Sequence, residues 1–91
     1  MARVIITITI MPESPETDLV LLEQHAGHVI TAHEGKIAEA KTEPIAFGLK
    51  ALKITFSKDE STGSTDAMEE ELRKLKNVVS AEVTAVSRAM G

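Results

Sequence analysis

The sequence contains no cysteine, no tryptophan and no tyrosine, and phenylalanine occurs only twice. Without cysteine, the chain has no disulfide, no thiolate metal site and no cysteine nucleophile. A basic excess is also missing, because 10 Lys and Arg stand against 14 Asp and Glu and give a net charge of −4. A surface that follows nucleic-acid phosphates needs a basic stripe. We therefore expect no direct binding of nucleic acid.

Long apolar runs are absent as well. The longest run near the N-terminus, VIITITIM, is too short to span a bilayer and is interrupted by threonine, and no signal peptide is visible. We expect no membrane contact and a cytoplasmic location, which suits a chain without cysteine. The 91 residues allow one domain, 1–91, whose core is built mainly from aliphatic side chains.

Alternation of apolar and polar residues predicts four strands, at residues 3–11, 36–43, 49–57 and 79–85. The first and third are rich in large apolar residues, which is typical of central strands. The second has charged and small side chains, which suit the edge of a sheet. In the last strand, one face is expected to carry Val79, Ala81, Val83 and Ala85.

Two amphipathic segments predict helices between these strands. Ser14 followed by Pro15 has the form of an N-cap and a first helical residue, and Gly35 is a suitable stop for that helix. A polar loop at 58–66 precedes the second helix. The buried stripes of the two helices are expected to be Leu19, Leu22, Ala26, Val29 and Ile30, and then Met68, Leu72 and Leu75.

The resulting order, β-α-β-β-α-β, predicts a ferredoxin-like α+β sandwich. Right-handed crossovers place both helices on one face of a four-stranded antiparallel sheet, with the first and third strands in the centre. The core is expected to contain Val4, Ile6, Ile8, Leu52, Ile54, Leu72 and Val83. The opposite face of the sheet is expected to be uncovered and to carry Ile5, Thr7, Thr9, Lys53 and Thr55.

Residues able to support catalysis or metal binding are sparse. His25, His28 and His33 have spacings that bring them near one another around a helix, but no carboxylate or thiolate joins them at a convincing spacing. We interpret them as structural or solvent-facing. The consecutive glutamates at 69–71 fan around a helix and cannot converge as an acid–base pair. Acylphosphatases share the topology, but the loop MPESPETD lacks the arginine that they need. We expect no catalytic residue, no metal and no cofactor.

Phe47 lies in the segment EPIAFGLKALKI, at a place where a turn is expected. Pro44 fixes its own φ and Gly48 tolerates dihedrals that other residues avoid, so the two predict a short, rigid turn with Phe47 near its tip. The aromatic ring either folds back over the end of the core or projects as an anchor for a partner, and the residues by themselves leave both open.

The same segment closely resembles one found in archaeal translation elongation factor 1-beta and in the C-terminal exchange domain of its eukaryotic counterparts. MPESPETDL and the closing VTAVSRAMG also resemble this family, and the resemblance covers all 91 residues. It implies a ferredoxin-like domain that binds elongation factor 1-alpha, the GTPase that delivers aminoacyl-tRNA, in its GDP-bound and nucleotide-free forms. The domain would promote exchange of GDP for GTP by differential binding, without being an enzyme.

The resemblance also implies where the GTPase binds. In this family the turn and the end of the last strand face the partner, so the expected partner-binding residues are Pro44, Ile45, Phe47, Gly48, Lys50, Arg88 and Met90. Eukaryotic relatives have a lysine near the C-terminus that is thought to reach the Mg²⁺ site of the GTPase, whereas Arg88 is the nearest cation here. An alternative expectation is a ferredoxin-like regulatory module that binds a small molecule and dimerises through its sheet.

Overall fold

The computed structural model describes residues 3–59 and 65–89. Strands and helices follow one another in the order predicted from the sequence. The elements are β1 (Arg3–Pro12), α1 (Leu19–Ala32), β2 (Lys36–Pro44), β3 (Lys50–Asp59), α2 (Asp66–Arg73) and β4 (Val78–Ala89).

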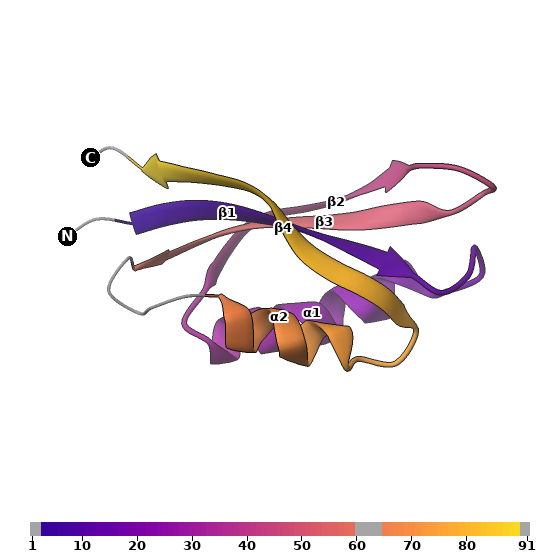
Figure 1. Cartoon of the computed structure of the whole chain (residues 1–91), viewed down its shortest axis with the longest axis horizontal. Coiled ribbons are helices and arrows are strands. Elements are labelled where there is room, and N and C mark those ends of the chain that lie inside the picture. The colour runs from indigo at the N-terminus through magenta and orange to yellow at the C-terminus, as the bar shows by residue number, and fades with distance from the viewer. Residues whose placement is uncertain (1–2, 60–64, 90–91) are drawn as a thin grey trace.

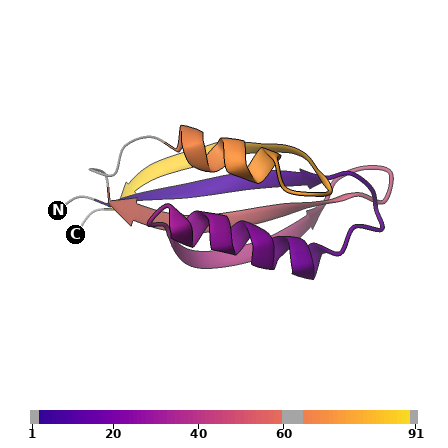
Figure 2. The ribbon, with the colours of Figure 1, turned by 90° about the horizontal axis from the view of Figure 1, so that it is seen from below.

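The four strands form one antiparallel sheet in the order β2-β3-β1-β4. β1 and β3 are central, as their apolar composition predicts, and the charged β2 lies at an edge. Figure 2 shows α1 and α2 next to each other on one face of the sheet, and in Figure 1 both helices lie below it. The predicted ferredoxin-like α+β sandwich is confirmed.

The core lies between the sheet and the two helices. The residues packed there are Ile6, Ile8, Ile10, Leu22, Ala26, Ile30, Leu52, Ile54, Phe56, Met68, Leu72, Val78 and Ala81. Five of the seven predicted core residues are buried, and the other two, Val4 and Val83, are partly buried against this cluster. The buried Phe56 supplies the aromatic ring of the core.

The predicted start of α1 at Ser14 and Pro15 is wrong. Asp18 is the N-cap, because its carboxylate accepts hydrogen bonds from the amides of Val20 and Leu21 at 3.0 and 3.2 Å. Ser14 forms a separate turn, in which its carbonyl accepts a hydrogen bond from the amide of Thr17 at 3.2 Å. Residues 13–18 are therefore a loop that leads from β1 to the helix.

At the other end of α1, Gly35 has a packing role. The helix ends at Ala32, and the left-handed residue that follows is Glu34, with a φ of 66°. A Cβ on Gly35 would lie 2.5 Å from a side-chain methyl carbon of Ile30 and 3.0 Å from the ring of Phe56. Gly35 therefore lets the chain pass close to the core as it enters β2.

Strand β3 is longer than predicted. Lys58 and Asp59, expected in a polar loop, pair with Val4 and Arg3 of β1. The start of β1 supplies a pairing partner that the local sequence of β3 does not reveal. The next five residues of the predicted loop, 60–64, lie outside the described residues.

The predicted inner face of β4 is wrong at Val79 and Ala85. The pairing of β4 with β1 shifts between Met11 and Pro12 and again between Thr7 and Ile8. As a result Val78 enters the core while Val79 is 66% exposed, and Ala85 pairs with Thr7 on the open face. Such irregularities shift the side-chain alternation by one residue, and they depend on the partner strand.

Candidate functional site

The connection between β2 and β3 covers residues 45–49 and contains a turn with Phe47 and Gly48 at its centre. The amide of Leu49 donates to the carbonyl of Ala46 at 2.9 Å, and the amide of Ile45 donates to the carbonyl of Leu49 at 3.0 Å. Phe47 and Gly48 have φ values of 55° and 78°. Positive φ at both central residues is the pattern of a type I′ turn, whose twist matches that of the flanking strands. The short turn predicted from the sequence is present, with Phe47 at its centre.

Phe47 is the most unusual residue of this turn. Its side chain is 95% exposed, so the alternative in which the ring covers the end of the core is wrong. A left-handed backbone also costs a residue with a side chain about 1 kcal/mol or more, and type I′ turns favour Asn, Asp or Gly at this place. The chain therefore carries a strained, exposed aromatic residue, a combination that indicates a functional site.

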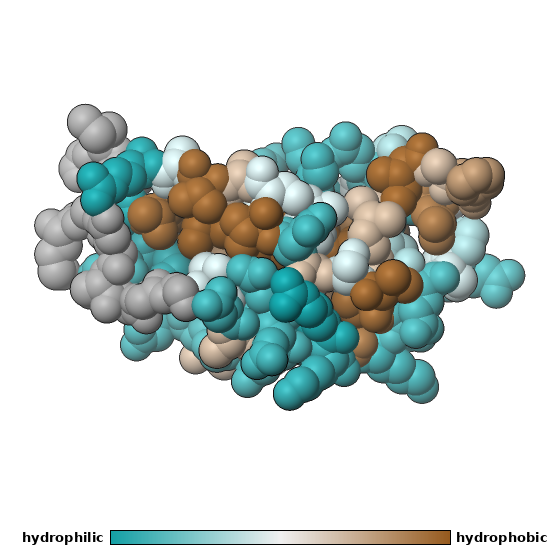
Figure 3. Space-filling model, viewed as in Figure 1, coloured by the Kyte–Doolittle hydropathy of each residue, from teal (hydrophilic) through white to brown (hydrophobic). Residues whose placement is uncertain are grey.

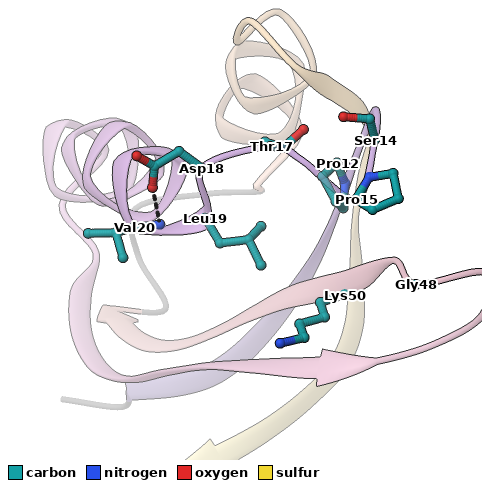
Figure 4. A pocket seen from close by; sticks show the side chains of 9 residues that line it. All are labelled: Pro12, Ser14, Pro15, Thr17, Asp18, Leu19, Val20, Gly48 and Lys50. Atoms are coloured by element: carbon teal, nitrogen blue, oxygen red, sulfur yellow. Dashed lines mark hydrogen bonds between the residues drawn. The ribbon is translucent and has the colours of Figure 1, made fainter.

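The loop from β1 to α1 lies against the turn. The Cβ and Cγ of Pro15 lie 3.8 and 3.9 Å from where a Cβ of Gly48 would be. Between this loop, the start of α1 and the start of β3 is an open cavity of about 340 Å³ (Figure 4). It is lined by Pro12, Ser14, Pro15, Thr17, Asp18, Leu19, Val20, Gly48 and Lys50.

Further apolar side chains are exposed at this end of the molecule. Ile45 in the turn is 46% exposed, and Val20 and Leu21 in the first turn of α1 are 70% and 48% exposed. Figure 3 shows hydrophobic surface at the right-hand end, where Figure 1 shows the connection between β2 and β3. An exposed apolar surface on a small protein is typical of a binding site for another macromolecule.

The structure separates the predicted site residues into two groups. Pro44 and Lys50 pair with each other at the base of the turn. Arg88, which is exposed, pairs with Val4 at the far end of β1, near both termini of the described chain (Figure 1). Lys58 of β3 also pairs with Val4, so the distance along β3 from Lys50 to Lys58 approximates the separation of the two groups. This distance is about 26 Å, in a molecule 42 Å long. Met90 lies outside the described residues.

Lys53 and Lys50 of β3 lie on opposite faces of the sheet. Lys53 points to the open face of the sheet, where its ammonium lies 2.7 Å from the carboxylate of Glu43. The hydrogen bond from Lys53 and its positive charge hold the pKa of Glu43 below its usual value. Lys50 lies an odd number of residues from Lys53 and so points to the helix side.

The histidines do not form a metal site. His25 and His28 are exposed on α1, and His33 binds the carboxylate of Glu71 at 3.0 Å. Within residues 3–59 and 65–89, no group of three or more His, Asp or Glu side chains is placed to hold a metal ion. No helix in the same ranges is long and apolar enough to cross a membrane.

Nearly the whole chain matches one protein family. The model of the family described as "EF-1 guanine nucleotide exchange domain" matches residues 5–89, which include both the Phe47 turn and Arg88. The chain belongs to this family. Members of this family are nucleotide exchange factors and not enzymes. The predicted exchange function and the prediction that the chain is not an enzyme are therefore confirmed.

Curated members of the exchange-domain family match over most of their length. Elongation factor 1-beta of Methanobrevibacter smithii is 40% identical over 90 residues, which cover 99% of this chain and 100% of that protein. The protein of the same name from Methanosphaera stadtmanae is 41% identical with the same coverage. That of Pyrococcus abyssi is 45% identical over 82 residues, or 89% of each chain. The resemblance noted in the sequence is confirmed.

Solved structures support the fold of this exchange domain. The C-terminal domain of MgtC from Mycobacterium tuberculosis matches with a TM-score of 0.63 at 10% identity, covering 96% of this chain and 87% of that one. The ACT domain of a GTP pyrophosphokinase from Chlorobium tepidum matches with a TM-score of 0.58 at 17% identity, covering 88% and 96%. At these identities the likeness shows the shared βαββαβ fold alone.

Sequence reasoning missed the contribution of the β1–α1 loop. The sequence predicts a helix start at Pro15, whereas in the structure Pro15 packs beside Gly48, and both prolines of MPESPETD line the cavity. The only signal in the sequence is the presence of two prolines in one short connection, which indicates a stiff loop. Its position against the turn follows from tertiary structure.

Proposed function

We propose that this chain promotes the exchange of GDP for GTP on elongation factor 1-alpha and so regenerates the form that binds aminoacyl-tRNA. Membership in the exchange-domain family supports this partner. The observation that carries the proposal is the 95% exposed Phe47 on a turn with positive φ. Exposed aromatic residues on rigid elements lose little entropy on docking and are common at binding hot spots.

The partner-binding residues of this proposal form two regions. The first is the turn with Pro44, Ile45, Phe47, Gly48 and Lys50, and the second is the end of β4 with Arg88, to which we also assign Met90, two residues further along the sequence. Because the regions lie at opposite ends of a 42 Å molecule, one copy of the domain contacts two separate parts of the GTPase.

Exchange by this route requires no chemical step. The domain binds the GDP-bound GTPase, prefers the nucleotide-free form, and by this preference speeds the departure of GDP. Arg88 is the cation nearest to the position of the C-terminal lysine of eukaryotic relatives, and it contributes to the second contact region. Residues 1–91 act as one domain without a cofactor, in the cytoplasm where translation takes place.

The test is the release of a fluorescent GDP analogue from elongation factor 1-alpha of the same organism, with excess unlabelled GTP. We expect the domain to raise the release rate in a saturable manner. Phe47→Ala and Arg88→Ala should each lower the effect, because they alter the two proposed regions separately. An unchanged release rate over a wide range of domain concentrations would rule out the proposed function.

A further inference from the structure

The cavity beside the Phe47 turn has mixed walls: apolar side chains lie beside the polar Ser14 and Thr17, the carboxylate of Asp18 and one cation, Lys50. Pro12 is buried, Pro15 and Val20 are exposed, and Leu19 is half-buried. Lys50 closes the side of the cavity formed by β3. Figure 4 shows its side chain next to β3, below Leu19 and Val20 in that view. A group that enters the cavity therefore meets apolar side chains and an ammonium group together.

The side chain of Lys50 reaches this cavity because of the alternation of β3. Leu52, Ile54 and Phe56 point to the helices and are fully buried, and Lys50 lies two residues before Leu52 on the same side of the strand. Lys53 points to the opposite face, where it pairs with Glu43. The two lysines are therefore three residues apart in sequence but lie on opposite faces of the sheet.

Within the described part of the chain, Lys50 forms no ion pair. Asp18 also lines the cavity, but one of its oxygens accepts the amide hydrogens of both Val20 and Leu21; Figure 4 shows the bond to Val20. This carboxylate is therefore held at the start of α1. The positive charge of Lys50 remains available to a group from outside the molecule.

The position of the cavity determines what an occupant must supply. Gly48 belongs both to the turn and to the lining of the cavity, so a partner that binds the turn lies next to the cavity that Lys50 lines. A lysine that loses contact with water without gaining a negative charge is strongly destabilising for the complex. A partner surface that binds here therefore needs a carboxylate opposite Lys50 and an apolar group opposite Pro15 and Val20.

We propose that this cavity is a docking site for an Asp or Glu side chain of the GTPase, carried next to an apolar residue that packs on Pro15, Leu19 and Val20. The inference rests on the proposed function, and it adds the β1–α1 loop and the first turn of α1 to the interface. Lys50 binds the carboxylate, and Phe47 binds beside it.

Carbodiimide coupling tests this contact directly, because the reagent joins an amine only to a carboxylate that touches it. The complex with elongation factor 1-alpha is treated with a carbodiimide, and the products are mapped by mass spectrometry. We expect a link between Lys50 and an Asp or Glu of the GTPase, which Lys50→Arg should abolish because arginine keeps the charge but loses the amine. Lys53→Arg is the matched control and should leave the link in place. Absence of a Lys50 link in a complex that still forms would overturn the proposal.

Kinetics separate this inference from the proposed function. Lys50→Met should raise the domain concentration needed for half-maximal GDP release by on the order of 10- to 100-fold, Lys50→Glu should raise it further, and Lys50→Arg should restore most of the loss. Lys53→Met should change it by less than about twofold, because exposed ion pairs contribute little.

The outcomes are distinct. If Phe47→Ala impairs GDP release while Lys50→Met and Lys50→Glu do not, the carboxylate contact is wrong and the proposed function stands. If the unmodified domain does not accelerate GDP release, both are wrong. Thermal unfolding of each variant shows whether it is folded. Because Lys50 is exposed, its replacement should leave the unfolding temperature nearly unchanged.

Discussion

Replacement of Phe47 by alanine separates a role in binding from a role in stability. The ring is 95% exposed, so its removal takes almost no apolar surface out of the core. We therefore expect the free energy of unfolding to change by well under about 1 kcal/mol. The matched control is Phe56→Ala at the other phenylalanine, which is fully buried. That change should cost about 3–5 kcal/mol, a large part of the stability of a domain of this size.

The effect of Phe47→Ala on the complex should be much larger than its effect on folding. Loss of a hot-spot aromatic residue costs about 2 kcal/mol or more, which corresponds to a roughly 30-fold rise in Kd. Urea denaturation measures the first quantity. The dependence of GDP release on the concentration of the domain measures the second.

Asparagine at the same position sharpens the test. Asparagine tolerates the left-handed backbone better than phenylalanine does, and Phe47 has a φ of 55°. Phe47→Asn should therefore raise the free energy of unfolding by up to about 1 kcal/mol and still impair GDP release as strongly as alanine does. If Phe47→Ala lowers the unfolding temperature but leaves GDP release normal while the protein is folded, the binding role of Phe47 is refuted. Normal GDP release with both Phe47→Ala and Phe47→Asn would refute it as well.

Three further predictions concern other parts of the molecule. Gly35→Ala should lower the free energy of unfolding by about 1–3 kcal/mol, because the new Cβ would lie 2.5 Å from the Ile30 methyl carbon; urea denaturation measures this. Arg88→Ala should slow exchange but leave the urea midpoint nearly unchanged, because the side chain is exposed and the backbone pairing of β4 remains. Lys53 holds the pKa of Glu43 below 4.5 in the folded state, so the stability from this pair is present above that pH and lost as the pH falls through the lowered folded pKa. Lys53→Met should remove this part of the acid dependence, as thermal unfolding from pH 7 downward will show.

The parts of the fold that follow local rules were predictable from the sequence. The alternation in β1 and β3 is set by residues that are adjacent along the chain, and it places Ile6, Ile8, Leu52 and Ile54 correctly in the core. The shifts in β4 depend on which residues of β1 lie opposite, so the position of Val79 could not be predicted from its own segment. At α1, the Ser-Pro pair is a strong local capping signal, but Asp18 is the residue that binds the free amides.

In the candidate site, too, some features could be predicted from the local sequence and others depend on tertiary structure. A turn at Pro44–Gly48 is a local property, and the sequence predicts it. The backbone strain at Phe47 is not visible in the sequence, because phenylalanine is an unusual choice for a residue with positive φ. The contact between Pro15 and Gly48, and the cavity beside it, join segments about thirty residues apart and appear only once the sheet and α1 are assembled.

The distance between the two proposed contact regions is set by the sheet itself. Phe47 and Arg88 lie at opposite ends of paired strands. These strands cannot shorten without loss of backbone hydrogen bonds, so the sheet fixes the distance between the two residues. A GTPase can engage both ends only in conformations that place its two binding surfaces at that separation. If the partner changes this separation with its nucleotide state, the proposed domain would distinguish the states without moving, by the distance between its two contact regions.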